Sequence, residues 1–360
     1  LFDSLKTVIG NLYIVVIIIA VLISLATGVV GASVTLLGIM AAPHMMRLGY
    51  NPKLTAGVIA GGGSMIMIPP SVPLIVMAPT MNLNIIDLYA GALVPGLMIA
   101  AMYIIYVSFF PRPKSDEIPQ YGRVLIDVLP LTFLIAMVLG SMLFGLATST
   151  EAGAFGAFGA LILATLNGKL FLKEALLKTC DTTSVVMLLA LASIIFGAVF
   201  TSLGGDTVIV NALNTLPIPP WALVGCILVI CFLIGYPMEW AVVVLVFLPI
   251  FMPVLIASDV DMLWFAVCLG IVLQTAYLTP PVALTAYYLK KAVPTWDLGM
   301  IFKSMMPFMW MQVLAVIILF LAPGIATWFP NYLKTDNTSI INKIEGEIAF
   351  PSFENMIKEK

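Results

Sequence analysis

Long stretches without a charged side chain are the feature that most constrains this chain. A transmembrane helix needs about 20 mainly apolar residues to cross the hydrocarbon core of a bilayer. The alternating pattern of a membrane β-barrel is absent from these stretches. The sequence therefore predicts an all-α polytopic membrane protein. Ten stretches contain no Asp, Glu, Lys or Arg: 7–43, 54–86, 88–111, 128–150, 152–168, 182–205, 207–238, 240–258, 262–289 and 304–333.

The composition excludes several classes of protein. Only 9% of the residues are charged and 62% are apolar, whereas about a quarter of the residues of a soluble domain are charged. A net charge of −2 gives no basic surface for nucleic acid. The single histidine and the absence of a Cys-x-x-Cys pair argue against a zinc or haem site, and Gly61-Gly-Gly-Ser64 has no P-loop lysine after it. We therefore expect no cofactor, no ATP hydrolysis and no nucleic-acid partner.

Some uncharged stretches do not fit simple spans. The stretches 7–43, 54–86 and 207–238 are too long for one helix and too short for two, and Gly and Pro interrupt them. This pattern predicts broken helices or re-entrant hairpins. Residues 334–360 carry more than a quarter of the charged residues, so we expect a polar C-terminal tail outside the membrane fold.

The two halves of the chain repeat each other. The pairs Pro69-Pro70 and Pro280-Pro281 lie 211 residues apart, and Ser64 matches Thr275 at the same offset. This order predicts a first repeat over 1–111, connecting or scaffold helices over 112–205, and a second repeat over 206–333. Four further pairs match at offsets of 210 to 212 residues: Pro43 with Pro253, Asp87 with Asp297, Pro95 with Pro307, and Pro111 with Pro323.

The charges flanking the repeats predict opposite orientations in the membrane. Basic residues occur in 44–53, whereas the charged residues of the matching segment 254–261 are all acidic. The sign reverses after the Pro-Pro pairs, because 82–87 has no Lys or Arg while 290–303 has three Lys. Cytoplasmic loops collect Lys and Arg, so the two repeats are expected to be inverted.

Inverted repeats with paired broken helices are typical of secondary transporters. A Pro-Pro pair removes two backbone donors and ends a helix, which frees carbonyl groups and helix ends at membrane depth. Carbonyl oxygens suit Na⁺, and half-helix N-termini suit an anion. Ser64 and Thr275 each precede the first Pro by five residues, so their hydroxyls are candidate ligands. The alternative is a pair of kinked packing helices without a ligand.

Several longer motifs make the chain similar to one family. It resembles the large membrane subunit of tripartite ATP-independent periplasmic (TRAP) transporters across residues 1–330. The motifs, in the order that the family has them, are Ala26-Thr-Gly-Val-Val-Gly-Ala-Ser-Val-Thr35, Arg47-Leu-Gly-Tyr-Asn-Pro-Lys-Leu-Thr-Ala-Gly57, Ile68-Pro-Pro-Ser71, Ala147-Thr-Ser-Thr-Glu-Ala-Gly153, Gln274-Thr-Ala-Tyr-Leu-Thr-Pro-Pro281 and Tyr288-Leu-Lys-Lys-Ala-Val-Pro294.

The resemblance implies a function and partners. It implies sodium-driven import of small organic acids, such as a C4-dicarboxylate or a 2-oxo acid, by an elevator-type domain in a bacterial or archaeal inner membrane. A periplasmic substrate-binding protein delivers the substrate, and a small four-helix membrane subunit completes the complex. The family's large subunit has further membrane segments before the stretch that matches Leu1, so the chain is expected to be part of a longer or split protein.

The resemblance also implies two sodium sites, formed mostly by backbone carbonyl groups. No other metal is expected. The first group of residues is Ser33, Gly62, Gly63, Ser64 and Pro69. The second group is Gly235, Gln274, Thr275, Thr279 and Pro280.

Two acidic residues are candidates for substrate binding or ion coupling. Glu151 follows Thr148 by three residues, which is the spacing of a helix capping box, so a capping role competes with a coupling role. Glu239 stands between two apolar stretches beside Pro237, and a functional and a structural role are both open.

Three other functions compete with binding-protein-dependent transport. One is a sodium/anion symporter of a related elevator family that works without a binding protein. Another is a channel-like or scaffolding membrane subunit. The third is an intramembrane enzyme using Glu239 and Glu151, but no nucleophile or metal cluster accompanies them in the sequence. We therefore expect a transporter subunit rather than an enzyme.

Overall fold

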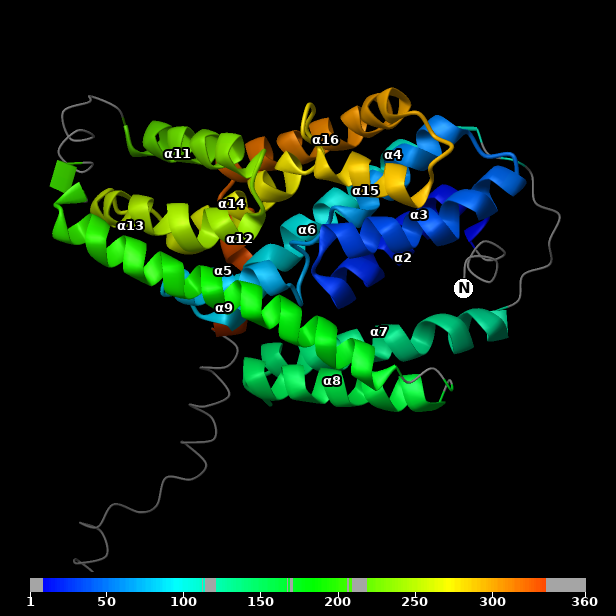
Figure 1. The fold of residues 1–360 in the computed structure, drawn as a ribbon, viewed down its shortest axis with the longest axis horizontal. Helices are drawn as coiled ribbons and strands as arrows, with labels where there is room; N and C mark the ends of the chain where they lie inside the picture. The colour runs from blue at the N-terminus through cyan, green and yellow to red at the C-terminus, as the bar shows by residue number, and fades with distance from the viewer. Residues whose placement is uncertain are drawn as a thin grey trace, which may run out of the picture.

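The structure is a computed structural model that describes residues 9–111, 113, 121–166, 168, 171–205, 207–208 and 219–334. Every regular element in these ranges is helical (Figure 1). The predicted all-α polytopic membrane protein is confirmed, since five helical segments are long and apolar enough to cross a bilayer. They are α6 (Ile85–Ser108), α8 (Ser149–Leu166), α9 (Leu172–Ser202), the continuous segment Trp240–Ala257 and α16 (Leu298–Leu321).

The first helices form a hairpin. Helices α2 (Leu12–Thr27) and α3 (Val30–Arg47) are joined at Gly28, which has a φ of +61°. A Cβ atom on Gly28 would lie 2.9 Å from Val72 Cγ2. Both the left-handed backbone and the close approach require glycine, so the sequence around Gly28 fixes the tip of the hairpin.

A broken helix follows this hairpin, as the stretch 54–86 predicts. Helix α4 (Pro52–Gly63) and helix α5 (Val72–Thr80) are separated by the non-helical segment 64–71, and α6 comes next. The 12 residues of α4 extend about 18 Å, which is well short of a bilayer core of about 30 Å. Two half-helices are therefore needed to cross it.

The same order of elements occurs again after residue 219. Helix α11 (Pro220–Gly235) pairs with a segment made of α12 (Trp240–Val242), the π-helix η1 (Val243–Phe247) and α13 (Leu248–Ala257). The half-helices α14 (Met262–Ala276) and α15 (Leu284–Ala292) flank the non-helical segment 277–283, and α16 follows. The first set of elements, α2 to α6, and the second set, α11 to α16, thus both run as hairpin, half-helix, break, half-helix and long helix. The first break is the segment 64–71, and the second break is the segment 277–283.

The loops between hairpin and half-helix lie at opposite ends of the fold. The loop before α4, the end of α6 and the start of α16 surround a hollow of about 540 Å³ lined by Lys53, Tyr106 and Lys303. At the other end, a Cβ atom on Gly91, near the start of α6, would lie 3.4 Å from Leu263 in the first turn of α14. This arrangement gathers Lys53 and Lys303 at one end.

Close packing of α4 on α16 holds the two sets together. Gly57 and Gly61 are four residues apart on α4 and face Phe308 of α16, whose ring atoms would lie 2.7 Å from a Cβ atom on either glycine. A Cβ atom on Gly57 would also meet the carbonyl oxygen of Ser304. Small residues at this spacing let two membrane helices approach closely.

The middle of the chain forms an arm along one side of the fold (Figure 1). Helix α7 (Tyr121–Leu143) packs on α8, where Gly156 lies against Val138. Helix α9 buries only Ser193 among its residues. Its exposed apolar side chains make it a surface for lipid or for another membrane protein. The predicted tail lies outside the described residues from position 335 onward.

We predict that Gly57→Val destabilises the protein by about 1–3 kcal/mol, because the new side chain overfills the α4–α16 contact. Thermal unfolding of the detergent-solubilised protein measures this. Gly197→Val on α9 is the matched control, because no atom lies within 4 Å of a Cβ atom there. Equal melting temperatures for the two variants would contradict the packing argument.

Candidate functional site

The first break is closed by hydrogen bonds of its own. The Ser64 hydroxyl donates to the carbonyl oxygen of Gly61 at 2.8 Å, and the Ser71 hydroxyl donates to that of Ile66 at 2.6 Å. The backbone N–H of Ser71 donates to the Tyr89 hydroxyl of α6 at 3.3 Å. Residues 64–69 are all buried, so this irregular backbone is surrounded by protein.

The first hairpin encloses the C-terminal end of α4. A Cβ atom on Gly63 would lie 2.6 Å from Val34, and the Ser24 hydroxyl donates to the carbonyl oxygen of Gly62 at 3.5 Å. Ser33 is fully buried next to Val34 on α3. The structure therefore brings Ser33, Gly62, Gly63 and Ser64 to one end of α4. Pro69 lies in the same break, in a cis peptide bond with Pro70.

The second hairpin lies against the end of α14 in the same way. A Cβ atom on Gly235 would lie 3.2 Å from Leu273 and 3.5 Å from Ala276. The backbone N–H of Trp240 donates to the Tyr277 hydroxyl at 2.9 Å, which ties the hairpin tip to the second break.

The hydroxyls of the second group bond within their own helix end. Thr275 donates to the carbonyl oxygen of Ile271 at 2.7 Å, and Thr279 donates to that of Thr275 at 2.8 Å. Pro280 forms a cis peptide bond with Pro281. Gly235, Thr275 and Thr279 are thus carried by elements that meet at the second break.

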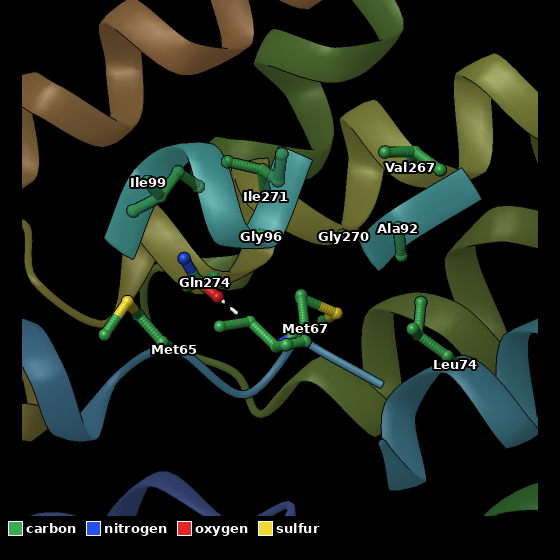
Figure 2. A pocket seen from close by; sticks show the side chains of 11 residues that line it. Met65, Met67, Leu74, Ala92, Gly96, Ile99, Val267, Gly270, Ile271 and Gln274 are labelled. Carbon is green, nitrogen blue, oxygen red and sulfur yellow. Dashed lines mark hydrogen bonds between the residues drawn. The ribbon is translucent and has the colours of Figure 1, made fainter. Parts of the chain in front are cut away.

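The side chain of Gln274 faces the first break rather than the second, which the sequence does not predict. Its Oε1 accepts a hydrogen bond from the backbone N–H of Met67 at 3.3 Å (Figure 2). The two residues border a cavity of about 10 Å³, which is close to the space that one water molecule needs, between the first break, α6 and α14. Gln274 therefore links α14 to Met67 in the first break, 207 residues earlier.

Each hairpin also packs on the second half-helix of the other set. On the first hairpin, Gly31 lies 2.9 Å from the Tyr288 ring and Gly38 lies 2.7 Å from Ala292, both distances measured from a Cβ atom built on the glycine. Tyr288 and Ala292 belong to α15. On the second hairpin, α12 and η1 contact α5. The two sets are therefore interlocked.

The two candidate carboxylates have different surroundings. Glu151 Oε2 accepts from both the backbone N–H and the hydroxyl of Thr148 at 2.8 Å, so the predicted capping box is present. Glu239 is exposed at the start of α12, and its side chain makes no capping hydrogen bond. It lies close enough to Tyr277 and Tyr288 to interact electrostatically with both.

Three buried polar residues near the two breaks were not predicted from the sequence. Gln312 of α16 and Tyr103 of α6 are fully buried beside Ser64. Thr285 is fully buried at the start of α15, where its backbone N–H donates to the carbonyl oxygen of Tyr277 at 3.3 Å. Among the residues that the structure describes, Gln312 Oε1 and Thr285 Oγ1 have no hydrogen-bond partner. The sequence feature that could have pointed to Gln312 is an amide side chain flanked by apolar residues within the uncharged stretch 304–333.

The chemistry of the breaks suits a small hard cation and an anion. Helices α4 and α14 direct their negative C-terminal ends at the breaks, whereas α5 and α15 direct their positive N-terminal ends there. The side-chain oxygens at the two ends are hydroxyl and amide oxygens. In the described part of the chain, no three His, Cys, Asp or Glu side chains cluster in a way that could hold a metal ion.

Comparison with known proteins places these features in a family. Residues 7–325 match the family described as "Tripartite ATP-independent periplasmic transporter, DctM component". The chain is 25% identical to the C4-dicarboxylate TRAP transporter large permease protein DctM of Pseudomonas aeruginosa, over 90% of this chain and 78% of that protein. It is 27% identical to the 2,3-diketo-L-gulonate TRAP transporter large permease protein YiaN of Escherichia coli, over 76% of this chain and 67% of that protein.

A longer relative shows the same similarity. The chain is 24% identical to the isethionate TRAP transporter permease protein DctMQ of Oleidesulfovibrio alaskensis. The similarity covers 83% of this chain and 49% of that protein.

We predict that Gln274→Met destabilises the protein by about 1–3 kcal/mol, because the buried N–H of Met67 loses its acceptor. Thermal unfolding of the variant and of the parent protein measures the difference. A Met variant as stable as the parent protein would contradict a structural role for this hydrogen bond.

Proposed function

Because the chain belongs to the DctM component family of TRAP transporters, we propose that it couples sodium entry to the import of a small organic acid. Membership in the family makes it a large permease subunit and not an enzyme. It is a multi-pass protein of the inner membrane. The sodium coupling, the elevator movement and the substrate class are our proposals.

The observation that carries the proposal is the pair of hairpin-covered half-helix ends. At the first end, α4 stops at Gly63 with the Ser64 hydroxyl beside it, and at the second, α14 stops one residue after Thr275. Carbonyl groups at such ends and nearby hydroxyls are the ligands that transporters use for Na⁺. We assign one sodium site to Ser33, Gly62, Gly63, Ser64 and Pro69, and the other to Gly235, Gln274, Thr275, Thr279 and Pro280. Gln274 would contribute its backbone carbonyl group, because its side chain faces the first break.

An inverted repeat and an elevator movement fit this arrangement. Two sets with the same order of elements have their equivalent loops at opposite ends, and Lys53 and Lys303 are gathered at one end. That end would face the cytoplasm by the positive-inside rule. The interlocked hairpins and half-helices would then move as one transport domain, with the arm of α7 to α9 in the scaffold.

The substrate would bind where the two hairpin tips meet α5 and α15. The positive N-terminal ends of these half-helices favour a carboxylate or sulfonate group. The relatives named above for C4-dicarboxylate, 2,3-diketo-L-gulonate and isethionate are consistent with an anionic substrate. Glu239 and Tyr288 lie at this place, so we propose Glu239 as a coupling residue. Glu151 is assigned to helix capping.

The transporter would need two partner proteins. We propose a periplasmic binding protein that delivers the substrate and a small four-helix membrane subunit. The exposed apolar faces of α8 and α9 offer surface for that subunit. A symporter that works without a binding protein is the competing possibility, and the uptake experiment separates the two.

The decisive experiment is uptake of a labelled organic acid into proteoliposomes that contain the complete membrane complex. We expect uptake only with an inward sodium gradient and an added binding protein. Uptake that persists when potassium replaces sodium would disprove the sodium coupling. Uptake that needs sodium but no binding protein would instead favour the competing symporter.

We predict that Thr275→Val raises the sodium concentration for half-maximal uptake about tenfold, because a site ligand worth about 1.4 kcal/mol is lost. Thr165→Val on α8 is the matched control, since Thr165 makes the same hydrogen bond to the carbonyl oxygen four residues earlier, at 2.7 Å. An unchanged sodium requirement at normal expression would remove Thr275 from the site.

A further inference from the structure

Gln312 joins three helices at the first break. This residue of α16 is fully buried, and its Nε2 donates to the Ser64 hydroxyl oxygen at 3.2 Å and to the Tyr103 hydroxyl oxygen at 2.8 Å. Ser64 closes α4, and Tyr103 belongs to α6. Gln312 is thus hydrogen-bonded to the hydroxyl that is proposed to bind sodium, although it is 248 residues away in sequence.

The hydrogen bonds around Gln312 fix which way its amide faces. Ser64 donates its hydroxyl hydrogen to the carbonyl oxygen of Gly61 at 2.8 Å, and Tyr103 donates its own to that of Phe308 at 3.2 Å. Both hydroxyl oxygens can therefore only accept, so the NH₂ group of Gln312 must face them. Oε1 consequently accepts from neither hydroxyl, and it is buried without a donor among the residues that the structure describes.

A buried acceptor without a donor in this position is suited to a cation. Oε1 and Nε2 are bonded to the same carbon, so Oε1 lies within one amide group of Ser64. The C-terminal end of α4, which carries the negative end of the helix dipole, lies at the same place and would favour a positive charge there. A side-chain amide oxygen is a hard neutral ligand of the same kind as a backbone carbonyl.

We propose that Oε1 of Gln312 is a direct ligand of the sodium ion at the first site, beside Ser64. This inference rests on the proposed function, because it adds a ligand from α16 to a site otherwise built from α3 and α4. Nε2 holds the Ser64 hydroxyl in position, and Oε1 supplies the further oxygen. The first site would therefore be shared between the two halves of the chain.

The test measures sodium-induced stabilisation of the purified membrane complex, with choline chloride at equal ionic strength as the reference. An ion that binds only the folded protein stabilises it by RT ln(1 + c/Kd), where c is the sodium concentration, so the melting temperature rises with the sodium concentration. We expect Gln312→Met to lose most of the sodium-induced shift at the first site and to raise the half-saturating sodium concentration for uptake about tenfold. Gln312→Glu keeps an oxygen at this position and is expected to retain sodium binding.

Two controls separate a ligand from a packing residue. Tyr103→Phe removes an acceptor of Nε2 but leaves Oε1, so it is expected to keep the sodium-induced shift. Tyr13→Phe removes a buried hydroxyl that accepts from the N–H of Asn51 at 3.1 Å, at the far end of α4, and controls for stability.

Each outcome has a distinct meaning. Loss of the shift in Gln312→Met alone supports the ligand assignment. An unchanged shift in Gln312→Met, or an equal loss in Tyr103→Phe, overturns it while leaving the proposed function intact. A parent complex that neither transports with sodium nor is stabilised by it overturns both the inference and the proposed function.

Discussion

The fold depends on the requirement that backbone polar groups inside a membrane find partners. Lipid offers none, so a break in a helix at membrane depth persists only where protein encloses it. The segment 64–71 is enclosed by the first hairpin, α6 and α16, and its own Ser64 and Ser71 hydroxyls satisfy two carbonyl groups. The segment 277–283 is tied to the second hairpin through Tyr277 and Trp240. The hairpins are therefore what allows the chain to hold broken helices.

This requirement also explains why the two sets of elements are interlocked. A hairpin can cover only part of a break, and the remainder is covered by elements of the other set: α3 lies on α15, and α12 with η1 lies on α5. Gln274 completes the arrangement by accepting a hydrogen bond from Met67 in the opposite break. Because each break is closed partly by the other set, displacement of one hairpin alone would expose unpaired backbone. The two hairpins are accordingly expected to move with the half-helices that they cover.

The sequence was informative where the physics is local. Scarce charges predict membrane helices, paired prolines predict the two breaks, and Thr148 with Glu151 predicts a capping box that is present. Contacts between distant segments leave no local pattern. Gln274 stands next to Thr275 in sequence, yet its side chain faces Met67. Gln312 is a polar residue in a mostly apolar helix, and only packing of α16 on α4 and α6 brings it to Ser64.

The scarcity of charge bears finally on how a loaded transport domain would cross a membrane. A charged side chain at the bilayer centre is costly, so sites made of hydroxyl, amide and carbonyl oxygens leave the empty domain with little charge to move. Within the hairpin tips, residues 26–31 and 235–240, Glu239 is the only charged side chain. Two bound sodium ions would balance Glu239 together with one negative charge on the substrate. In the proposed mechanism, sodium would thus serve both as the driving ion and as the counter-ion that makes the loaded domain nearly neutral.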